Sequence, residues 1–287
     1  MFANKSMKQF RFIFIGILAC CVAFLFVGAS PNANNVTIAQ LSDTHLGEEH
    51  SPQADANLRQ AVKMINDRHP DAVILSGDIG ENEKEWEQVK TILKDLTCPV
   101  YCVPGNHDVR NTNDLARYRN QFGPDYYRFQ VKNLEVLALD SELLGNYAKW
   151  GNWKTLPPLP PGMEEESQKM LTWLGQQEEL TKGKMVIAVQ HIPLFRDNNF
   201  PKSNAYWIVD APYSAREVDL LHRLGVKHLL AGHWHIGRVF MQEGLTIHVA
   251  PATSWLPFGG QLGFAMHTIT ANGDMHTEFV PLPNATP

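Results

Sequence analysis

The chain has 287 residues, with 25 Lys and Arg against 30 Asp and Glu and a formal net charge of -5. This balance provides no polyanion-binding surface, so we expect no groove for nucleic acid, although a single nucleotide is not excluded as a substrate. Hydrophobic residues make up 44% of the chain, which suffices for one large α/β core or for two smaller domains.

The N-terminal segment differs in composition from the rest. Lys5, Lys8 and Arg11 precede residues 12–29, which carry no charge, and small residues follow at 28–30. This order is typical of an export signal, and the apolar run is also long enough for a transmembrane helix. Residues 17–20 resemble a lipoprotein cleavage box. We therefore predict a signal peptide or membrane anchor over 1–34 and a main domain over 35–287.

Either reading of the N-terminal segment places the main domain outside the cytoplasm. A cleaved signal gives a secreted protein, periplasmic or extracellular. A retained segment attaches the domain to a membrane through residues 12–29. Of the four cysteines, only Cys98 and Cys102 lie in the main domain. Four positions along a strand span about 13 Å, too far for a disulfide, so we predict two free thiols.

Strand-like and helical patterns alternate along the first half of the main domain, which indicates βαβ units. After Arg238 the helical patterns end, and short strands at 239–241, 246–249, 264–266 and 278–280 suggest an antiparallel ending. Helices are expected at 54–68, 84–96, 113–122, 165–180 and 214–224. Apolar strands are expected at 36–41, 72–75, 100–103, 135–139, 185–189 and 227–231.

Two segments fit neither pattern. Residues 143–162 contain Trp150, Trp153 and a run of prolines, and residues 196–212 contain Tyr206 and Trp207. Long irregular segments in a compact domain are usually functional loops. The density of aromatic residues favours the rim of a binding pocket, and a solvated surface insertion is the alternative.

Metal-ligand side chains recur in five short motifs, each directly after a strand-like run. Apart from Asp108 and Gln190, they supply two carboxylates, one amide and five imidazoles, the ligand types of a two-metal hydrolytic centre. The other histidines have no such context, and we predict structural roles for His50, His69, His222, His228, His248, His267 and His276. The motifs are Ser42-Asp43-Thr44-His45, Ser76-Gly77-Asp78, Gly105-Asn106-His107-Asp108, Gln190-His191 and Gly232-His233-Trp234-His235.

The ordered series resembles the calcineurin-like metallophosphoesterase superfamily. The sequence around His191, with Asn106-His107-Asp108, is most similar to the subgroup called calcineurin-like phosphoesterase domain-containing proteins. The resemblance spans Asp43 to His235. It implies an α/β fold, a four-layer αββα sandwich of two mixed β-sheets flanked by helices, which is the metallo-dependent phosphatase fold.

The resemblance also implies a role for each motif residue. Asp43, His45 and His235 would hold a first metal ion. Asn106, His191 and His233 would hold a second, and Asp78 would bridge the two. Mixed nitrogen and oxygen ligands suit Mn, Fe or Zn better than Ca, so two divalent or trivalent ions of those elements are the implied cofactors.

Two cations about 3.5–4 Å apart repel each other, so an anionic bridge such as Asp78 is needed between them. The ions lower the pKa of bound water, and a bridging hydroxide would attack the phosphoryl group in line. His107 would face the substrate as the general acid that protonates the leaving alkoxide.

Three further residues are candidates near the substrate or behind the ligands. Glu81 would accept a hydrogen bond from His107, or else be an exposed loop carboxylate. Asp108 would orient its loop, and Arg110 would meet a phosphate oxygen. Glu81 stands where purple acid phosphatases carry a tyrosine, and the segment after Asp78 lacks the arginine of the phosphoprotein phosphatase branch. The resemblance therefore favours neither branch.

The sequence thus predicts an enzyme, a metal-dependent phosphoesterase that acts on a small phosphoester or a phosphoprotein. A phosphomonoesterase is the leading interpretation. A cyclic-nucleotide or other phosphodiesterase with the same centre is the first alternative. A catalytically inactive binding module on this scaffold is the second, disfavoured because all eight motif positions are occupied.

Overall fold

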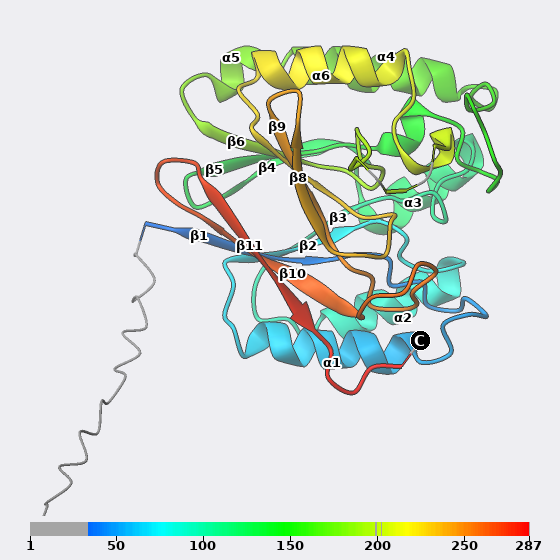
Figure 1. Ribbon diagram of the computed structural model, residues 1–287, viewed down its shortest axis with the longest axis vertical. Helices are drawn as coiled ribbons and strands as arrows, with labels where there is room; N and C mark the ends of the chain where they lie inside the picture. The colour runs from blue at the N-terminus through cyan, green and yellow to red at the C-terminus, as the bar shows by residue number, and fades with distance from the viewer. Residues whose placement is uncertain (1–33, 199, 202, 287) are drawn as a thin grey trace, which may run out of the picture. The chain divides into compact units, whose positions relative to one another are not determined.

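Strands and helices alternate in the first half of the chain, as the sequence predicts. The computed structural model describes residues 34–198, 200–201 and 203–286 (Figure 1). The first three strands pair in parallel in chain order, so each of the two helices between them is a crossover between neighbouring strands. The elements are β1 (Val36–Leu41), α1 (Ala54–Asn66), β2 (Ala72–Ser76), α2 (Glu83–Leu93), β3 (Val100–Val103) and α3 (Thr112–Phe122).

The second part of the chain contains more elements than the sequence predicted. The strand β4 (Tyr127–Val131) was not predicted, and the helix expected at 165–180 is two helices separated by Gln176 and Gln177. The remaining elements are β5 (Leu134–Ala138), η1 (Ser141–Leu144), α4 (Met163–Gly175), α5 (Glu178–Thr181), β6 (Met185–Val189), η2 (Ala205–Trp207), α6 (Tyr213–Arg223), β7 (His228–Ala231), β8 (Arg238–Gln242), β9 (Leu245–Val249), β10 (Gly263–Ile269) and β11 (Met275–Pro281).

The strands form two mixed sheets. A five-stranded sheet has the order β11-β10-β1-β2-β3, and a six-stranded sheet has the order β4-β5-β6-β7-β9-β8. The predicted antiparallel ending is correct for β8, β10 and β11. It is also correct for the pairing of β9 with β8, but β9 pairs in addition with β7 in parallel, which was not predicted. The tight connection from β8 to β9 forms a hairpin that reverses the chain beside β7.

The two sheets pack face to face, with helices on both outer faces. Helices α1 and α2 cover the five-stranded sheet, and α4, α5 and α6 cover the six-stranded sheet (Figure 1). Alternate residues of β1 face opposite ways: Val36 and Ile38 pack between the sheets, and Ala39 and Leu41 pack in the core toward the helices. The predicted four-layer αββα sandwich is confirmed.

A chain of polar side chains crosses the core from one sheet to the other. The residues His248 and His267 are buried and hydrogen-bonded, so their predicted structural role is confirmed. The contacts run from the Gly273 carbonyl to His228 Nε2 (3.1 Å), from His228 Nδ1 to His248 Nε2 (3.0 Å), from His248 Nδ1 to Thr277 Oγ1 (2.7 Å), from Thr277 Oγ1 to His267 Nδ1 (2.9 Å) and from His267 Nε2 to Gln40 Oε1 (3.0 Å).

Gln40 connects this chain to the strand ends. Its amide nitrogen donates to the Ala231 carbonyl at 2.9 Å and to Ser76 Oγ at 2.8 Å. Both partners directly precede motif glycines, Gly232 and Gly77. The polar chain therefore ends at the backbone that carries two of the five motifs.

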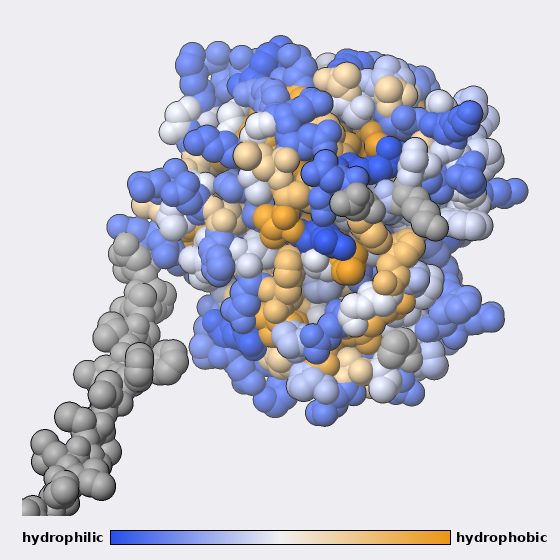
Figure 2. Space-filling view, in the orientation of Figure 1, coloured by the Kyte–Doolittle hydropathy of each residue, from blue (hydrophilic) through white to orange (hydrophobic). Residues whose placement is uncertain are grey.

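Residues 1–33 lie outside the described part of the chain, and with them the predicted signal or anchor and its segment 12–29. Among the described residues, no helix combines the length and the apolar composition that a membrane crossing requires. Cys98 and Cys102 are free thiols, as predicted. The face drawn in Figure 2 is mostly polar, with apolar patches among the hydrophilic side chains. Val239 and Met241 of β8 and Phe279 of β11 are exposed hydrophobic residues.

Candidate metal centre

The five motifs converge because each directly follows the carboxyl end of a strand. Three of these strands, β1, β2 and β3, belong to the five-stranded sheet, and β6 and β7 belong to the six-stranded sheet. Ligands of open α/β sheets are typically bound outside the carboxyl ends of the strands. The site therefore lies where these ends of the two sheets meet.

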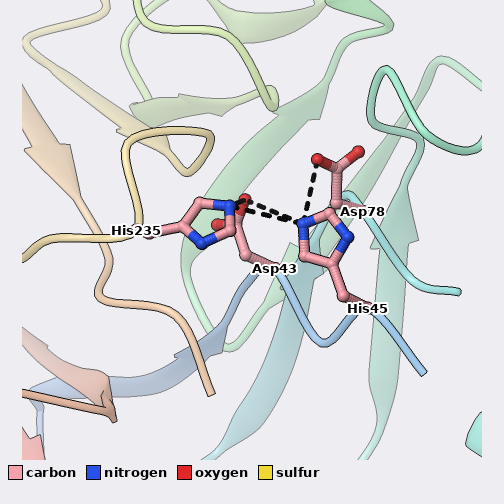
Figure 3. A group of neighbouring side chains, drawn as sticks. All are labelled: Asp43, His45, Asp78 and His235. Carbon is pink, nitrogen blue, oxygen red and sulfur yellow. Dashed lines mark hydrogen bonds and ion pairs between the residues drawn. The ribbon is translucent and has the colours of Figure 1, made fainter. Parts of the chain in front are cut away.

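The first group of side chains contains Asp43, His45, Asp78 and His235, whose ligand atoms all lie within 4.8 Å of one another. His235 Nε2 lies 3.2 Å from Asp43 Oδ1, and His45 Nε2 lies 3.4 Å from Asp78 Oδ2. The two imidazoles point toward each other, with their Nε2 atoms 3.3 Å apart (Figure 3). All four residues are buried.

A second group shares Asp78 with the first and adds His191 and His233. His191 Nε2 lies 3.2 Å from Asp78 Oδ2. Asn106 belongs to the same neighbourhood because its amide nitrogen donates to the Tyr206 hydroxyl at 3.1 Å, and Tyr206 packs on the His233 ring. The structure thus brings together all seven residues that the resemblance implied as ligands, in two groups joined by Asp78.

Hydrogen bonds to backbone carbonyls fix the ring orientation of three of these histidines. His191 Nδ1 donates to the Ser76 carbonyl at 2.7 Å, His235 Nδ1 to the Trp255 carbonyl at 2.9 Å, and His233 Nε2 to the Tyr206 carbonyl at 3.0 Å. A neutral imidazole carries one N–H, so the other nitrogen of each ring is left as a bare electron-pair donor. Metal-binding histidines are oriented in this way.

The backbone at these motifs adopts left-handed conformations with positive φ, which residues other than glycine rarely adopt. Asp43, His45, Asp78, His233 and His235 have φ values of 51°, 41°, 51°, 67° and 57°. Residues in this left-handed region cost free energy and persist where the surrounding structure imposes them, often at functional sites. The five side chains are thereby held in their positions by the fold.

Two motif glycines permit close approach of neighbouring loops. A Cβ atom at Gly77 would lie 2.5 Å from His191 Nδ1, and one at Gly105 would overlap Asp78 Oδ1. Any side chain at these positions would push a ligand group away from the centre.

His107 differs from the other motif histidines in its contacts. Its Nδ1 lies 3.0 Å from Glu81 Oε1, and Nε2 makes no hydrogen bond to another described residue. Burial lowers the pKa of His107, but the charge of Asp78 and the hydrogen bond to Glu81 outweigh burial and raise the pKa to about 9. Glu81 also lies 3.4 Å from His45 Nδ1, which rules out the alternative of an exposed loop carboxylate.

Asp108 ties neighbouring loops together. Its buried carboxylate accepts the backbone N–H groups of Ile79 and Gly105 and the indole N–H of Trp86, at 3.1, 2.9 and 3.1 Å. Arg110 lies on the outer side of Glu81, with its guanidinium 3.9 Å from Glu81 Oε2.

A cavity of about 460 Å³ opens above the two groups and is called here the aromatic cavity. Trp150 and Trp207 line it, so the prediction that the irregular segments form a pocket rim is confirmed for these residues. His50 also lines it, although the sequence predicted a structural role. Glu48, Trp255 and Phe258 were not predicted, because no motif or spacing distinguishes them. The floor contains Asp78, Asn106, His107, Tyr206, His233 and His235.

The donor set fits metal ions. Asn106 Oδ1 and His191 Nε2 are buried and have no hydrogen-bond partner among the described residues, although buried polar atoms are normally satisfied. The site also attracts positive charge: burial lowers the pKa of His191, but the carboxylates of Asp78 and Asp43 outweigh burial and raise the pKa to about 10, so that without a metal ion a proton on this ring takes the place of a cation. Cations bound between these groups would satisfy both the bare donor atoms and the carboxylates.

Comparisons with known proteins agree with this chemistry. The calcineurin-like phosphoesterase family matches residues 36–237. The chain is 25% identical over 231 residues to a Fibrobacter succinogenes protein named probable cyclic nucleotide phosphodiesterase, which covers 75% of this chain and 79% of that protein. It is 26% identical over 261 residues to human serine/threonine-protein phosphatase CPPED1, and this alignment covers 85% of this chain and 77% of that protein.

The fold has also been seen in solved structures. A dimetal phosphatase from Danio rerio superposes with a TM-score of 0.61 at 15% sequence identity, and the match covers 86% of this chain and 96% of that chain. This likeness concerns the arrangement of sheets and helices.

Proposed function

Because the chain belongs to the calcineurin-like phosphoesterase family, it is a metal-dependent phosphoesterase, and we propose that it hydrolyses phosphomonoesters at a pair of metal ions. The observation that carries the proposal is the pair of ligand groups that share Asp78. The first ion would be held by Asp43, His45 and His235. The second would be held by Asn106, His191 and His233.

The mixed nitrogen and oxygen donors favour Mn, Fe or Zn for both positions. When bound, such ions supply a water nucleophile of lowered pKa and neutralise charge on the phosphoryl oxygens. Asp78 contributes the negative charge that two neighbouring cations require. The backbone carbonyls behind His191, His233 and His235 hold each imidazole in the tautomer that can bind metal.

His107 is the proton donor in this proposal. Glu81 holds Nδ1, so Nε2 is the nitrogen that would protonate the leaving oxygen. His107 lines the same cavity as Asp78 and Asn106, so a phosphoryl group bound at the metals would lie beside it. The negative charges of Asp78 and Glu81 favour the protonated imidazole that an acid catalyst requires.

A phosphodiesterase with the same centre is the second candidate, because a relative that covers three quarters of the chain carries a phosphodiesterase name. Another relative is named a protein phosphatase, which keeps both small phosphoesters and phosphoproteins as candidate substrates. Initial rates of the metal-loaded domain on p-nitrophenyl phosphate and on bis(p-nitrophenyl) phosphate separate the two reaction classes. A preference for the diester would contradict the monoesterase proposal.

The third candidate, an inactive binding module, is tested by the same protein. We expect the domain after residue 34 to contain two equivalents of Mn, Fe or Zn by elemental analysis and to hydrolyse members of a phosphoester panel. A metal-loaded protein that hydrolyses none of them would favour the binding module.

We also propose that the catalytic domain lies outside the cytoplasm, secreted or attached to a membrane through residues 12–29. The support is the basic segment followed by an uncharged run in the sequence. Cell fractionation followed by N-terminal sequencing of the mature protein tests this. Recovery of the intact chain in the cytoplasm would contradict the proposal.

A further inference from the structure

Aromatic rings from separate chain segments surround the aromatic cavity. They belong to the loop after β1, the irregular segment after η1, helix η2 and the loop after β9. Because His107 and the metal-ligand residues form the floor, a leaving group that accepts a proton from His107 must occupy this cavity. The wall residues are Glu48, His50, Trp150, Trp207, Trp255 and Phe258.

Two aromatic pairs belong to the wall, each beside a different ligand histidine. Trp255 stacks on His50, with ring centroids 5.5 Å apart and an interplanar angle of 28°, and meets His235 edge-on at 5.0 Å. Trp207 meets Phe258 edge-on at 5.1 Å and lies 5.1 Å from His233. A flat group in the cavity could stack on one of these rings or meet it edge-on, the arrangements that aromatic groups prefer.

Among the residues that the structure describes, the cavity offers no unpaired basic side chain to a second anionic group: the imidazoles of His50 and His107 already contact the carboxylates of Glu48 and Glu81. None of the described residues that line it is a lysine or an arginine. The wall carboxylate of Glu48 is paired with His50 Nδ1 at 2.8 Å, and Arg110 contacts Glu81 outside the lining. A leaving group with its own negative charge would therefore lie beside aromatic rings and the carboxylate of Glu48 with no unpaired cation to offset it, which is unfavourable.

We propose that the aromatic cavity selects phosphoesters whose leaving group carries an uncharged planar ring, and that it rejects leaving groups with a further negative charge. The proposal rests on the phosphoesterase function proposed above. The volume of about 460 Å³ exceeds what a phosphoryl group needs and lies in the range of pockets that enclose a ring-sized ligand. A preference for acidic phosphopeptides would be the opposite result of the test.

The experiment compares esters of primary alcohols, so that the basicity of the leaving oxygen is matched. We would measure kcat/KM of the metal-loaded enzyme for 2-phenylethyl, 2-cyclohexylethyl and butyl phosphate, and for their methyl diesters in case the enzyme prefers diesters. Stacking predicts that the phenylethyl ester exceeds the butyl ester by about tenfold and also exceeds the cyclohexylethyl ester. Equal values for phenyl and cyclohexyl esters would overturn ring selection.

The charge preference is tested with the 4-carboxyl derivative of the phenylethyl ester and with an acidic phosphoserine peptide. We expect the carboxyl group to lower kcat/KM by about tenfold or more, the cost of burying an unpaired charge being large. A carboxylated ester or acidic peptide that is hydrolysed as fast as the phenylethyl ester would overturn this part of the proposal.

Phe258 is the best position for a variant, since its ring contacts Phe200 and Trp207 and no ligand histidine. Phe258→Leu keeps an apolar side chain without a ring, and we expect it to reduce the ratio of phenylethyl to butyl turnover by about threefold. Met241→Ala is the matched control, because Met241 is 75% exposed on β8 and does not line the cavity. An unchanged ratio in Phe258→Leu would contradict a stacking contact at this ring.

Failure of the proposed function and failure of ring selection can be distinguished. If the metal-loaded protein hydrolyses no phosphoester, the proposed function is wrong. Ring selection is then read from calorimetric binding of 2-phenylethylphosphonate and butylphosphonate, which need no turnover. Tighter binding of the phenylethyl compound supports it in either case, and equal binding overturns it.

Discussion

At the scale of single residues, the partner of one imidazole nitrogen distinguishes His107 from three of the four ligand histidines. His191, His233 and His235 each donate to a backbone carbonyl, which leaves a bare nitrogen directed at the ligand groups. His107 is bonded instead to the Glu81 carboxylate, whose charge favours the protonated ring. His45 also contacts Glu81 through Nδ1, but its Nε2 lies among the ligand groups of Asp78 and His235, whereas Nε2 of His107 does not.

Replacing His107 separates these roles. We expect His107→Asn to retain the bound metals and to slow turnover of alkyl phosphates by about 10²–10⁴, the usual contribution of general acid catalysis. Esters of p-nitrophenol should be affected less, because their leaving group needs little protonation. Steady-state kinetics on both substrate types, with metal content determined on the same samples, measures this. Full activity of the variant on alkyl phosphates would exclude His107 as the acid.

Asp78 is the one carboxylate common to both ligand groups. We expect Asp78→Asn to weaken metal binding by more than about 10²-fold, since even residues that only support metal ligands contribute 10- to 100-fold. Activity should fall with it. Metal titration followed by elemental analysis measures the loss, and Asp67→Asn, an exposed carboxylate at the end of α1, is the control. Normal metal content in Asp78→Asn would remove Asp78 from the centre.

At the scale of elements, the loops after β2 and β3 are joined through Asp108. It accepts hydrogen bonds from Ile79 in one loop, from Gly105 in the other and from Trp86 of α2. Asp78 and Asn106 lie in these same loops, so the distance between two ligands depends on a residue that itself faces away from the substrate.

Asp108→Asn tests this connection. An amide in place of the carboxylate directs N–H groups at backbone donors, and leaving a buried donor without an acceptor costs about 1–3 kcal/mol. We expect the free energy of unfolding to fall by about 2 kcal/mol in urea titrations. Asp95→Asn, at an exposed position after α2, should change it by less than about 0.5 kcal/mol. Similar stability of both variants would argue against the role of Asp108.

Much of the element order could be predicted from sequence, because buried strands are read from continuous apolar runs. The runs at 36–41, 100–103 and 185–189 match β1, β3 and β6. The missed strand β4 (Tyr127–Val131) carries Arg128 and Gln130 between its apolar residues, so it lacks such a run. The parallel pairing of β9 with β7 follows from a hairpin that tertiary packing places, which local pattern does not determine.

The candidate site shows a similar division. The seven ligand residues were predicted because they stand in motifs with recognisable order. The contact of Asn106 with Tyr206 joins residues 100 positions apart, so no local pattern predicts it. The left-handed backbone conformation of Asp43 and His235 was not predictable either, because neither position is a glycine. Trp255 and Phe258 likewise reach the cavity only through the path of the loop after β9. Sequence therefore identified the chemistry and not the shape of the substrate cavity.

At the scale of the whole domain, the buried histidines between the sheets predict how stability depends on pH. Burial lowers the pKa of His248 to about 3 and holds that of His267 well below its usual range. Between about pH 6.5 and pH 3 the unfolded chain therefore binds protons that the folded chain does not. Stability contributed by these histidines is present above pH 6.5 and is lost as pH falls through this window.

His248→Gln removes one of these titrating groups. We expect the loss in unfolding free energy between pH 7 and pH 5 to become smaller in the variant, by up to about 1.4 kcal/mol per pH unit. Denaturant titrations of the metal-free proteins at both pH values measure this without a contribution from metal release. His276→Gln, at an exposed position on β11, is the control and should keep the original dependence. The prediction would be refuted if the unfolding free energy depended on pH equally in the parent protein and in His248→Gln.

The polar chain between the sheets also has an unusual hydrogen count. Its five contacts end on two oxygens that can only accept, the Gly273 carbonyl and the amide oxygen of Gln40, whose amide hydrogens are used by Ala231 and Ser76. Three neutral imidazoles and one hydroxyl supply four hydrogens for these five contacts. One of the five contacts must therefore join two acceptors without a hydrogen between them. A change of tautomer along the chain moves this unbonded contact to another position. Gln40 thus joins the backbone behind two metal-binding loops to a hydrogen-bond network. This network can adopt several tautomeric arrangements, each with four hydrogen bonds.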